Sequence, residues 1–292
     1  MLVDYLHWYA EETYGASEAF LKSQPSLKTK LEDSLWAFNS LGQLIPETNE
    51  KFASGHYFPH SESFLNLQGS LELCMHGFYS RALVSLRSVL ELSAMGIYYD
   101  INDKSHITIK PWIESNFKTP SFKLMINSLL QLDYYERFDK VFGLRKELES
   151  LYDELGGFVH VRGYRFSSTG LSGANCVIFK PKPFEKFAKR LLQVVRLVSI
   201  MALLKYPIGI VPLPITEKFG FNGPVGGYLE QINTDQILAM LTKDEAGFMQ
   251  DIAKNDTRVQ EIVRYFENLP DISEEEFQKQ ANDWDRFMDE HT

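Results

Sequence analysis

The chain has 292 residues, of which 44% are hydrophobic and 24% are charged, and its net charge at pH 7 is -9. This composition is typical of an ordinary globular protein and excludes collagen-like, low-complexity and largely disordered chains. The length exceeds that of a common single domain, so we expect one large core with an appendage.

The termini, the cysteines and the apolar runs indicate the compartment. Cys74 and Cys176 lie in apolar surroundings far apart in the sequence, which predicts reduced, buried thiols. Asp4 and Glu11 stand where a signal peptide would carry positive charge. The longest uncharged apolar run, residues 197–204, is much shorter than the ~20 residues that cross a bilayer. We therefore expect a cytoplasmic protein that makes no membrane contact.

The first predicted elements are two helices, at residues 2–14 and 27–41, within an N-terminal segment (1–61) that packs on the core. Residues 62–99 then form two helices that meet near Gly77. The second of these has apolar or small residues on nearly every side. Because a surface helix would keep a charged face, this helix should be enclosed by others.

Further helices surround this central pair. One or two helices are expected at residues 121–141, and one each at 144–158 and 184–205, with a short helical piece near Trp112. Short apolar stretches flank the turn-rich TGLSG at 169–173, which predicts a small β-hairpin. The fold class is therefore mainly all-α, with an antiparallel bundle of four or five helices over residues 62–206.

Four prolines and five glycines in residues 206–227 mark a boundary after the bundle. The rest of the 207–292 segment is an appendage with helices expected at residues 228–241, 243–254, 257–268 and 273–289. Thr242 with Glu245, and Ser273 with Glu276, match the capping-box pattern at helix starts. Residues 244–292 contain 14 acidic and five basic side chains, so the appendage carries the excess negative charge.

Two charges within the central helix form the first candidate site. Arg87 and Glu91 are four residues apart and should face the interior of the bundle. One interpretation is a buried ion pair that sets the helix register, which costs about 3–5 kcal/mol to break by removing one member. The other interpretation is a pocket in which Arg87 binds an anion and Glu91 orients it.

His160, just past the end of the 144–158 helix, is the second candidate. Histidine is suited to proton transfer near neutral pH, and the nearby Arg162 could stabilise charge that develops on a phosphate. The alternative is a structural histidine that is hydrogen-bonded among Phe158, Val159 and Val161.

The sequence SRALVSLRSVLELSAMGIYY, followed downstream by LESLYDELGGFVHVRG, resembles the HEPN-like helical domains of bacteria, a group with uncharacterised members and toxin or defence proteins. The resemblance covers about residues 62–206. It implies a helical bundle, often dimeric, and in active members a metal-independent cleavage of RNA by an Arg placed shortly before a His. His160 matches the histidine, but the arginine is absent, and Arg162 or Arg87 would have to replace it.

Residues 157–205 contain nine basic side chains and one acidic one, Glu185, and this local clustering attracts anions. Their aromatic neighbours Tyr164, Phe166 and Phe184 could stack on bases. The alternative is a solvated face that pairs with the acidic appendage. The predicted nucleic-acid contacts are Arg162, Tyr164, Arg165, Lys180, Lys182, Lys186, Lys189 and Arg190.

Other motifs are weak. His56 and His60 have a metal-like spacing but no evident third ligand, and the glycines at 220–227 lack the ending of a phosphate-binding loop. We therefore predict no metal and no cofactor. The sequence favours a cytoplasmic interaction or ligand-binding protein of the HEPN-like kind, with a homodimer, RNA or another protein as partner, and with a role in bacterial defence or stress. The alternative is a metal-independent endoribonuclease that uses His160 with Arg162 or Arg87, with Glu91 in support.

Overall fold

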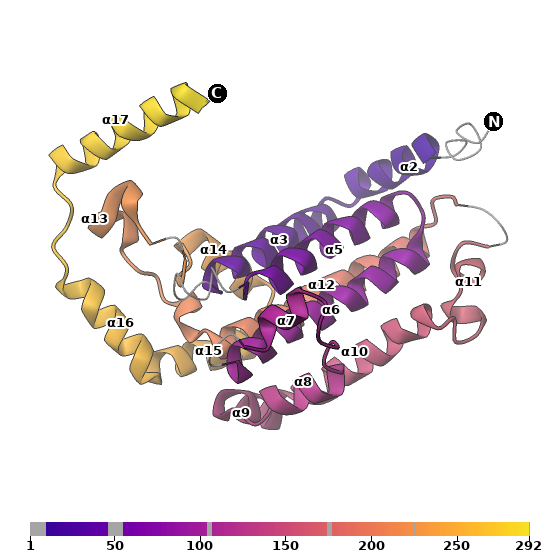
Figure 1. Cartoon of the computed structure of the whole chain (residues 1–292). Helices are drawn as coiled ribbons and strands as arrows, with labels where there is room; N and C mark the ends of the chain where they lie inside the picture. Colours follow the sequence, from indigo (N-terminus) through magenta and orange to yellow (C-terminus); the bar gives the residue numbers. More distant parts are fainter. Residues whose placement is uncertain (1–9, 46–54, 104–106, 174–176, 225, 292) are drawn as a thin grey trace.

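The computed structural model describes residues 10–45, 55–103, 107–173, 177–224 and 226–291, and every regular element in these ranges is helical (Figure 1). This confirms the all-α class. The predicted β-hairpin is wrong, because Tyr164–Phe166 forms the short helix η2 and Ser168–Ser172 forms α11. Ser167 begins α11, since its Oγ accepts a hydrogen bond of 3.0 Å from the Gly170 amide.

Helix α6 (Tyr79–Asn102) lies at the centre of the molecule. It is preceded by α5 (Phe58–Met75), and the turn between them contains Gly77 at φ +80°, a conformation that favours glycine. Helices α12 (Pro181–Lys205), α10 (Leu144–Val159) and α8 (Phe122–Leu129) also pack against α6. Most of α6 is thereby removed from water, as its apolar pattern predicts.

The N-terminal helices cover another side of this core. Helix α2 (Ala10–Ser23) and helix α3 (Pro25–Leu41) precede the short helix η1 (Gly42–Leu44). Part of the helix predicted at 2–14 lies outside the described residues, and the observed helix continues past residue 14 to Ser23. Helix α3 packs against α12 and against α14 (Gln231–Ala239) of the C-terminal segment, so α3 is part of the core.

Short helices connect the longer ones. They are α7 (Ile109–Ile113), α9 (Asp133–Phe142), η3 (Pro207–Ile210), α13 (Ile215–Phe219) and η4 (Gly220–Asn222).

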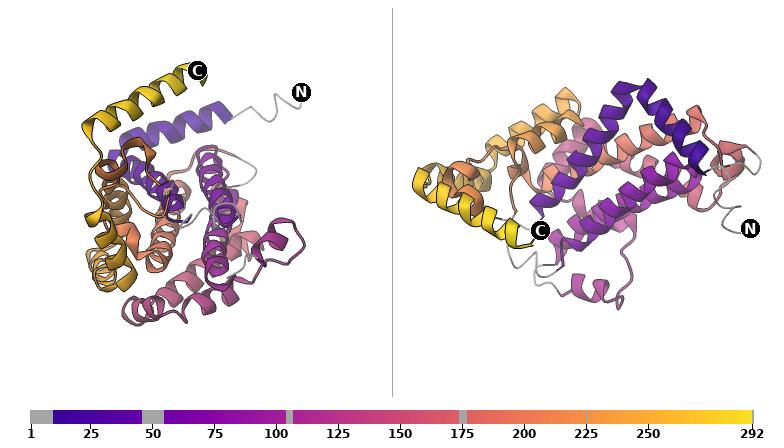
Figure 2. Two further views of the ribbon diagram at one scale, coloured as in Figure 1. Left: turned by 60° about the vertical axis from the view of Figure 1, so that its left-hand side comes forward. Right: turned by 90° about the horizontal axis from the view of Figure 1, so that it is seen from above.

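Four helices form the C-terminal segment: α14 (Gln231–Ala239), α15 (Lys243–Asn255), α16 (Thr257–Asn268) and α17 (Glu274–His291). The capping box predicted at Thr242 and Glu245 is confirmed. Helix α15 packs on the core through Phe248, whose ring meets those of Phe138 and Phe142. Helices α16 and α17 then extend to the end of the molecule that lies opposite α11 (Figures 1 and 2).

Candidate functional site

Arg87 and Glu91 form the ion pair that the sequence predicts, and a third residue completes it. Arg87 Nε lies 3.3 Å from Glu91 Oε1 on α6. The hydroxyl of Tyr152, on α10, accepts a hydrogen bond of 2.5 Å from Arg87 Nη2 and donates one of 2.5 Å to the same Glu91 oxygen. The three side chains therefore hold α6 and α10 together through a closed set of polar contacts.

Apolar neighbours cover this triad. The Arg87 guanidinium lies 4.2 Å from the centre of the Tyr152 ring, and Phe122 stacks on that ring with 4.1 Å between centroids. Gly156 permits the close approach, because a Cβ there would lie 2.9 Å from Arg87 Nη1. Only 18% of the Arg87 side chain and 35% of the Glu91 side chain are exposed. The arrangement leaves Arg87 largely committed to contacts within the protein.

The protonation of Tyr152 follows from its surroundings. Burial raises the pKa of Tyr152, and the hydrogen bond to the Glu91 carboxylate raises the pKa further. The hydroxyl therefore keeps its proton at neutral pH and acts as the donor to Glu91. The sequence places Tyr152 on the apolar stripe of α10, but its partners are 61 and 65 residues away in the sequence.

The end of α10 positions the next two candidates. The Arg162 amide donates to the Gly157 carbonyl oxygen at 2.9 Å, and between them Val161 has φ +45°, a strained conformation for a β-branched residue. This turn directs Arg162 back along α10. There its Nη1 lies 2.9 Å from Asp153 Oδ1, and its Nη2 donates to the Asp153 carbonyl oxygen.

The Arg162 guanidinium is therefore paired with Asp153. The hydrogen bond from Arg162 holds the pKa of the Asp153 carboxyl below its ordinary value. His160 is exposed, and within the described part of the chain its ring makes no hydrogen bond or ion pair with Arg87 or Arg162. The structure thus brings both arginines close to Gly156, where a Cβ would lie 2.9 Å from Arg87 Nη1 and 4.0 Å from Arg162 Nη2. Among the described residues, neither guanidinium is hydrogen-bonded to His160.

The predicted nucleic-acid contacts gather near α11 and the first half of α12, and we call them the basic surface. Its members are Arg162, Tyr164, Arg165, Lys180, Lys182, Lys186, Lys189 and Arg190. Lys186 and Arg190 pair with Glu154 of α10, at 3.8 and 2.7 Å.

Four other bases of the basic surface have no acidic partner among the described residues: Arg165, Lys180, Lys182 and Lys189. Arg165 instead lies over the Phe166 ring, 4.5 Å from its centre. Burial lowers the pKa of Lys186, and the charges of Arg190 and Arg165 lower the pKa further. This group of positive charges can attract a polyanion.

The aromatic residues near the basic surface divide into one exposed and two buried side chains. Tyr164 is 71% exposed and free to stack on a base, whereas Phe166 and Phe184 are 7% and 0% exposed. The prediction that Phe166 and Phe184 stack on bases is therefore wrong. Both rings are used in packing, with Phe166 edge-on to Phe158 at 5.1 Å and Phe184 edge-on to Phe20 at 5.4 Å.

Among the described residues, the ion pairs between residues 157–205 and the acidic residues 244–292 involve one base, Arg196, which binds Glu245 of α15. Arg196 also binds Glu147 of α10 at 2.7 Å. The Glu245 side chain is only 2% exposed, so this contact fixes α15 to the core. Helices α16 and α17 lie at the opposite end from α11 and do not cover the basic surface (Figure 2).

No family model, curated protein or solved structure matches this chain. Among the described residues, no three His, Cys, Asp or Glu side chains converge on one point as metal ligands would. None of the described helices has the length and apolar character that a bilayer span requires.

Proposed function

We propose that this chain is a cytoplasmic HEPN-like helical bundle that binds single-stranded RNA on its basic surface without cutting it. The proposal rests on the four bases that have no acidic partner in the described part of the chain and on the exposed Tyr164 beside them. Lys and Arg bind the phosphates of a nucleic acid whatever its base sequence, and an exposed aromatic ring can stack on an unpaired base.

The same geometry argues against cleavage. A nuclease of this kind would need a guanidinium free to stabilise the developing charge and a histidine within reach of it. Arg87 is bound by Glu91 and Tyr152, and Arg162 is bound by Asp153. His160 is exposed, and among the described residues its ring makes no hydrogen bond to either arginine. The Arg87–Glu91–Tyr152 triad therefore has a structural role between α6 and α10. We assign RNA binding to the basic surface.

The binding test uses a fluorescent single-stranded RNA and titrations at several salt concentrations. Replacing Arg165, Lys182 and Lys189 together by alanine should weaken binding about tenfold or more and make it less sensitive to salt, because each lost phosphate contact lowers the salt slope by about 0.7. The control replaces three exposed lysines of the C-terminal segment, Lys243, Lys254 and Lys279, by alanine. Equal effects of the two triple variants would refute the assignment of the surface.

The cleavage test separates this proposal from the endoribonuclease alternative. The wild-type protein and His160→Ala are incubated with the same RNA in a metal chelator, and the RNA length is followed by gel electrophoresis. We expect intact RNA with both proteins. Cleavage by the wild type that is lost in His160→Ala would establish the nuclease and overturn the binding-only proposal.

A further inference from the structure

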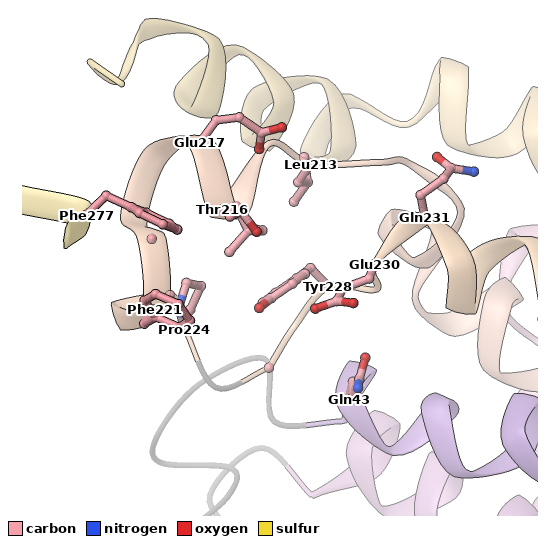
Figure 3. Close-up of a pocket in the computed structure, with 14 residues that line it drawn as sticks. Gln43, Leu213, Thr216, Glu217, Phe221, Pro224, Tyr228, Glu230, Gln231 and Phe277 are labelled. Carbon is pink, nitrogen blue, oxygen red and sulfur yellow. The ribbon is translucent and has the colours of Figure 1, made fainter. Parts of the chain in front are cut away.

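A pocket of about 690 Å³ lies in the C-terminal segment, between α13 and η4 on one side and the start of α14 on the other (Figure 3). Helix α17 closes one wall with Phe277, and Gln43 of η1 contributes from the core. Its volume falls within the range of ~300–1,000 Å³ that is typical of small-molecule sites. The pocket lies far from the basic surface, so a ligand bound here would be distinct from the RNA.

The charge of the lining is negative. Glu217 and Glu230 line the pocket, and no lysine, arginine or histidine is among the described residues that line it. The neighbouring Lys218 binds the Leu269 carbonyl oxygen and Asp271 instead, both at 2.7 Å. Neither carboxylate has an ion pair or side-chain hydrogen bond with another described residue. Glu230 lies at the start of α14, where the helix dipole contributes roughly half a positive charge. The full negative charge of the carboxylate exceeds this, so the net charge at this wall is negative.

Three aromatic rings also line the pocket. Tyr228 lies in the middle of the pocket with Glu230 beside it, while Phe277 and Phe221 line the opposite wall (Figure 3). The rings of Phe221 and Phe277 are 5.2 Å apart. Burial raises the pKa of Tyr228, and the charge of Glu230 raises the pKa further, so the ring keeps its phenol form.

We propose that this pocket binds an organic ammonium ion. The faces of aromatic rings attract cations, an unpaired carboxylate supplies the opposite charge, and the apolar wall of Phe221 and Phe277 accepts a carbon skeleton. A free inorganic cation would not use that wall, and an anion would be repelled by Glu217 and Glu230. The combination of rings and carboxylates therefore selects a positively charged group that carries an apolar body.

The test uses three probes that share one ring and differ in charge: benzylammonium, benzyl alcohol and benzoate. Binding to the full-length protein is followed by ligand-observed NMR titration. Affinity should decrease from benzylammonium to benzyl alcohol to benzoate. Equal affinity for the three probes, or no binding of benzylammonium, would overturn the proposal.

Variants locate the binding. Glu230→Gln should weaken benzylammonium binding about fivefold through the loss of a partly exposed ion pair. Tyr228→Leu should weaken it about fivefold through the loss of the ring face. Glu261→Gln, which removes one negative charge from the exposed surface of α16, is the matched control and should bind like the wild type. If Glu261→Gln and Glu230→Gln weaken binding equally, the probe follows net charge and the pocket is not its site.

Discussion

At the scale of single residues, Tyr152 makes the polar contact between α6 and α10, beside the buried leucines of α10. Its hydroxyl serves the Arg87 guanidinium and the Glu91 carboxylate at once, at 2.5 Å in both cases. Removing the hydroxyl leaves a partly buried donor and acceptor without their shared partner, which costs more than the net value of one hydrogen bond.

Tyr152→Phe should therefore lower the free energy of unfolding by about 1–2 kcal/mol. The stacking on Phe122 is preserved, so the change isolates the hydroxyl. Urea unfolding measures the effect, and Tyr164→Phe, which removes the hydroxyl of an exposed tyrosine, is the control. Equal stability of Tyr152→Phe and the wild type would show that the Tyr152 hydroxyl contributes nothing to the stability of the fold.

His60 gives a prediction about pH. The ring stacks on Phe38, 5.4 Å away, and burial lowers its pKa to about 4 despite a hydrogen bond with the Asn39 backbone, which raises the pKa. The unfolded imidazole takes up a proton near its ordinary pKa of 6.5. The folded protein should therefore have its full stability above that pH and lose about 3 kcal/mol as the pH falls from 6.5 to 4.

Urea unfolding at several pH values tests this assignment. His60→Gln should lose much less stability over the same pH range, whatever its stability at neutral pH. His160→Gln removes an exposed histidine and serves as the control. The same pH dependence in His60→Gln and the wild type would assign the acid sensitivity to another group.

At the scale of elements, the end of α10 contains a strained residue. Val161 at φ +45° occupies the position after the helix end where glycine is common, and an L-residue in this conformation costs about 1–2 kcal/mol. The turn it makes is what carries Arg162 back to Asp153.

Val161→Gly should raise the free energy of unfolding by up to about 1 kcal/mol, since the relief of strain exceeds the entropy that glycine loses on folding. Val159→Gly, two residues earlier and still within α10, should lower it by a similar amount because glycine is a poor helix former. Thermal unfolding measures the stability of both variants. Destabilisation by Val161→Gly would contradict the claim that Val161 is strained.

The helices were more predictable than the connections between them. Helix α10 alternates its apolar and charged residues with a clear helical period, and the predicted range of 144–158 differs from Leu144–Val159 by one residue. The segment of η2 and α11 is short and has no such period. Its conformation depends on the cap at Ser167 and on the hydrogen bond of 2.6 Å between Ser168 and Ser80 of α6.

The candidate site was predictable in part for the same reason. Arg87 and Glu91 are one turn apart on a single helix, so their pairing follows from local spacing. Tyr152 reaches them from another helix, and Asp153 captures Arg162 only because of the turn at Val161. Contacts of this kind depend on tertiary packing, which cannot be predicted from the local pattern of residues in one sequence.

At the scale of the whole molecule, charge is separated along the long axis. The basic surface lies at the end that carries α11, and the acidic helix α17 lies with α16 at the other end (Figures 1 and 2). Arg196, bound to Glu147 and Glu245, stands between them and fixes α15 to the core. A polyanion should therefore approach the α11 end and be repelled from the C-terminal helices.

Photo-cross-linking of the full-length protein to a 4-thiouridine-substituted RNA, with the linked peptides read by mass spectrometry, tests this account most directly. We predict that the linked residues lie within 160–190 and that Tyr164 is among them. Cross-links concentrated on α16 and α17, or distributed evenly over the chain, would contradict RNA binding at the basic surface.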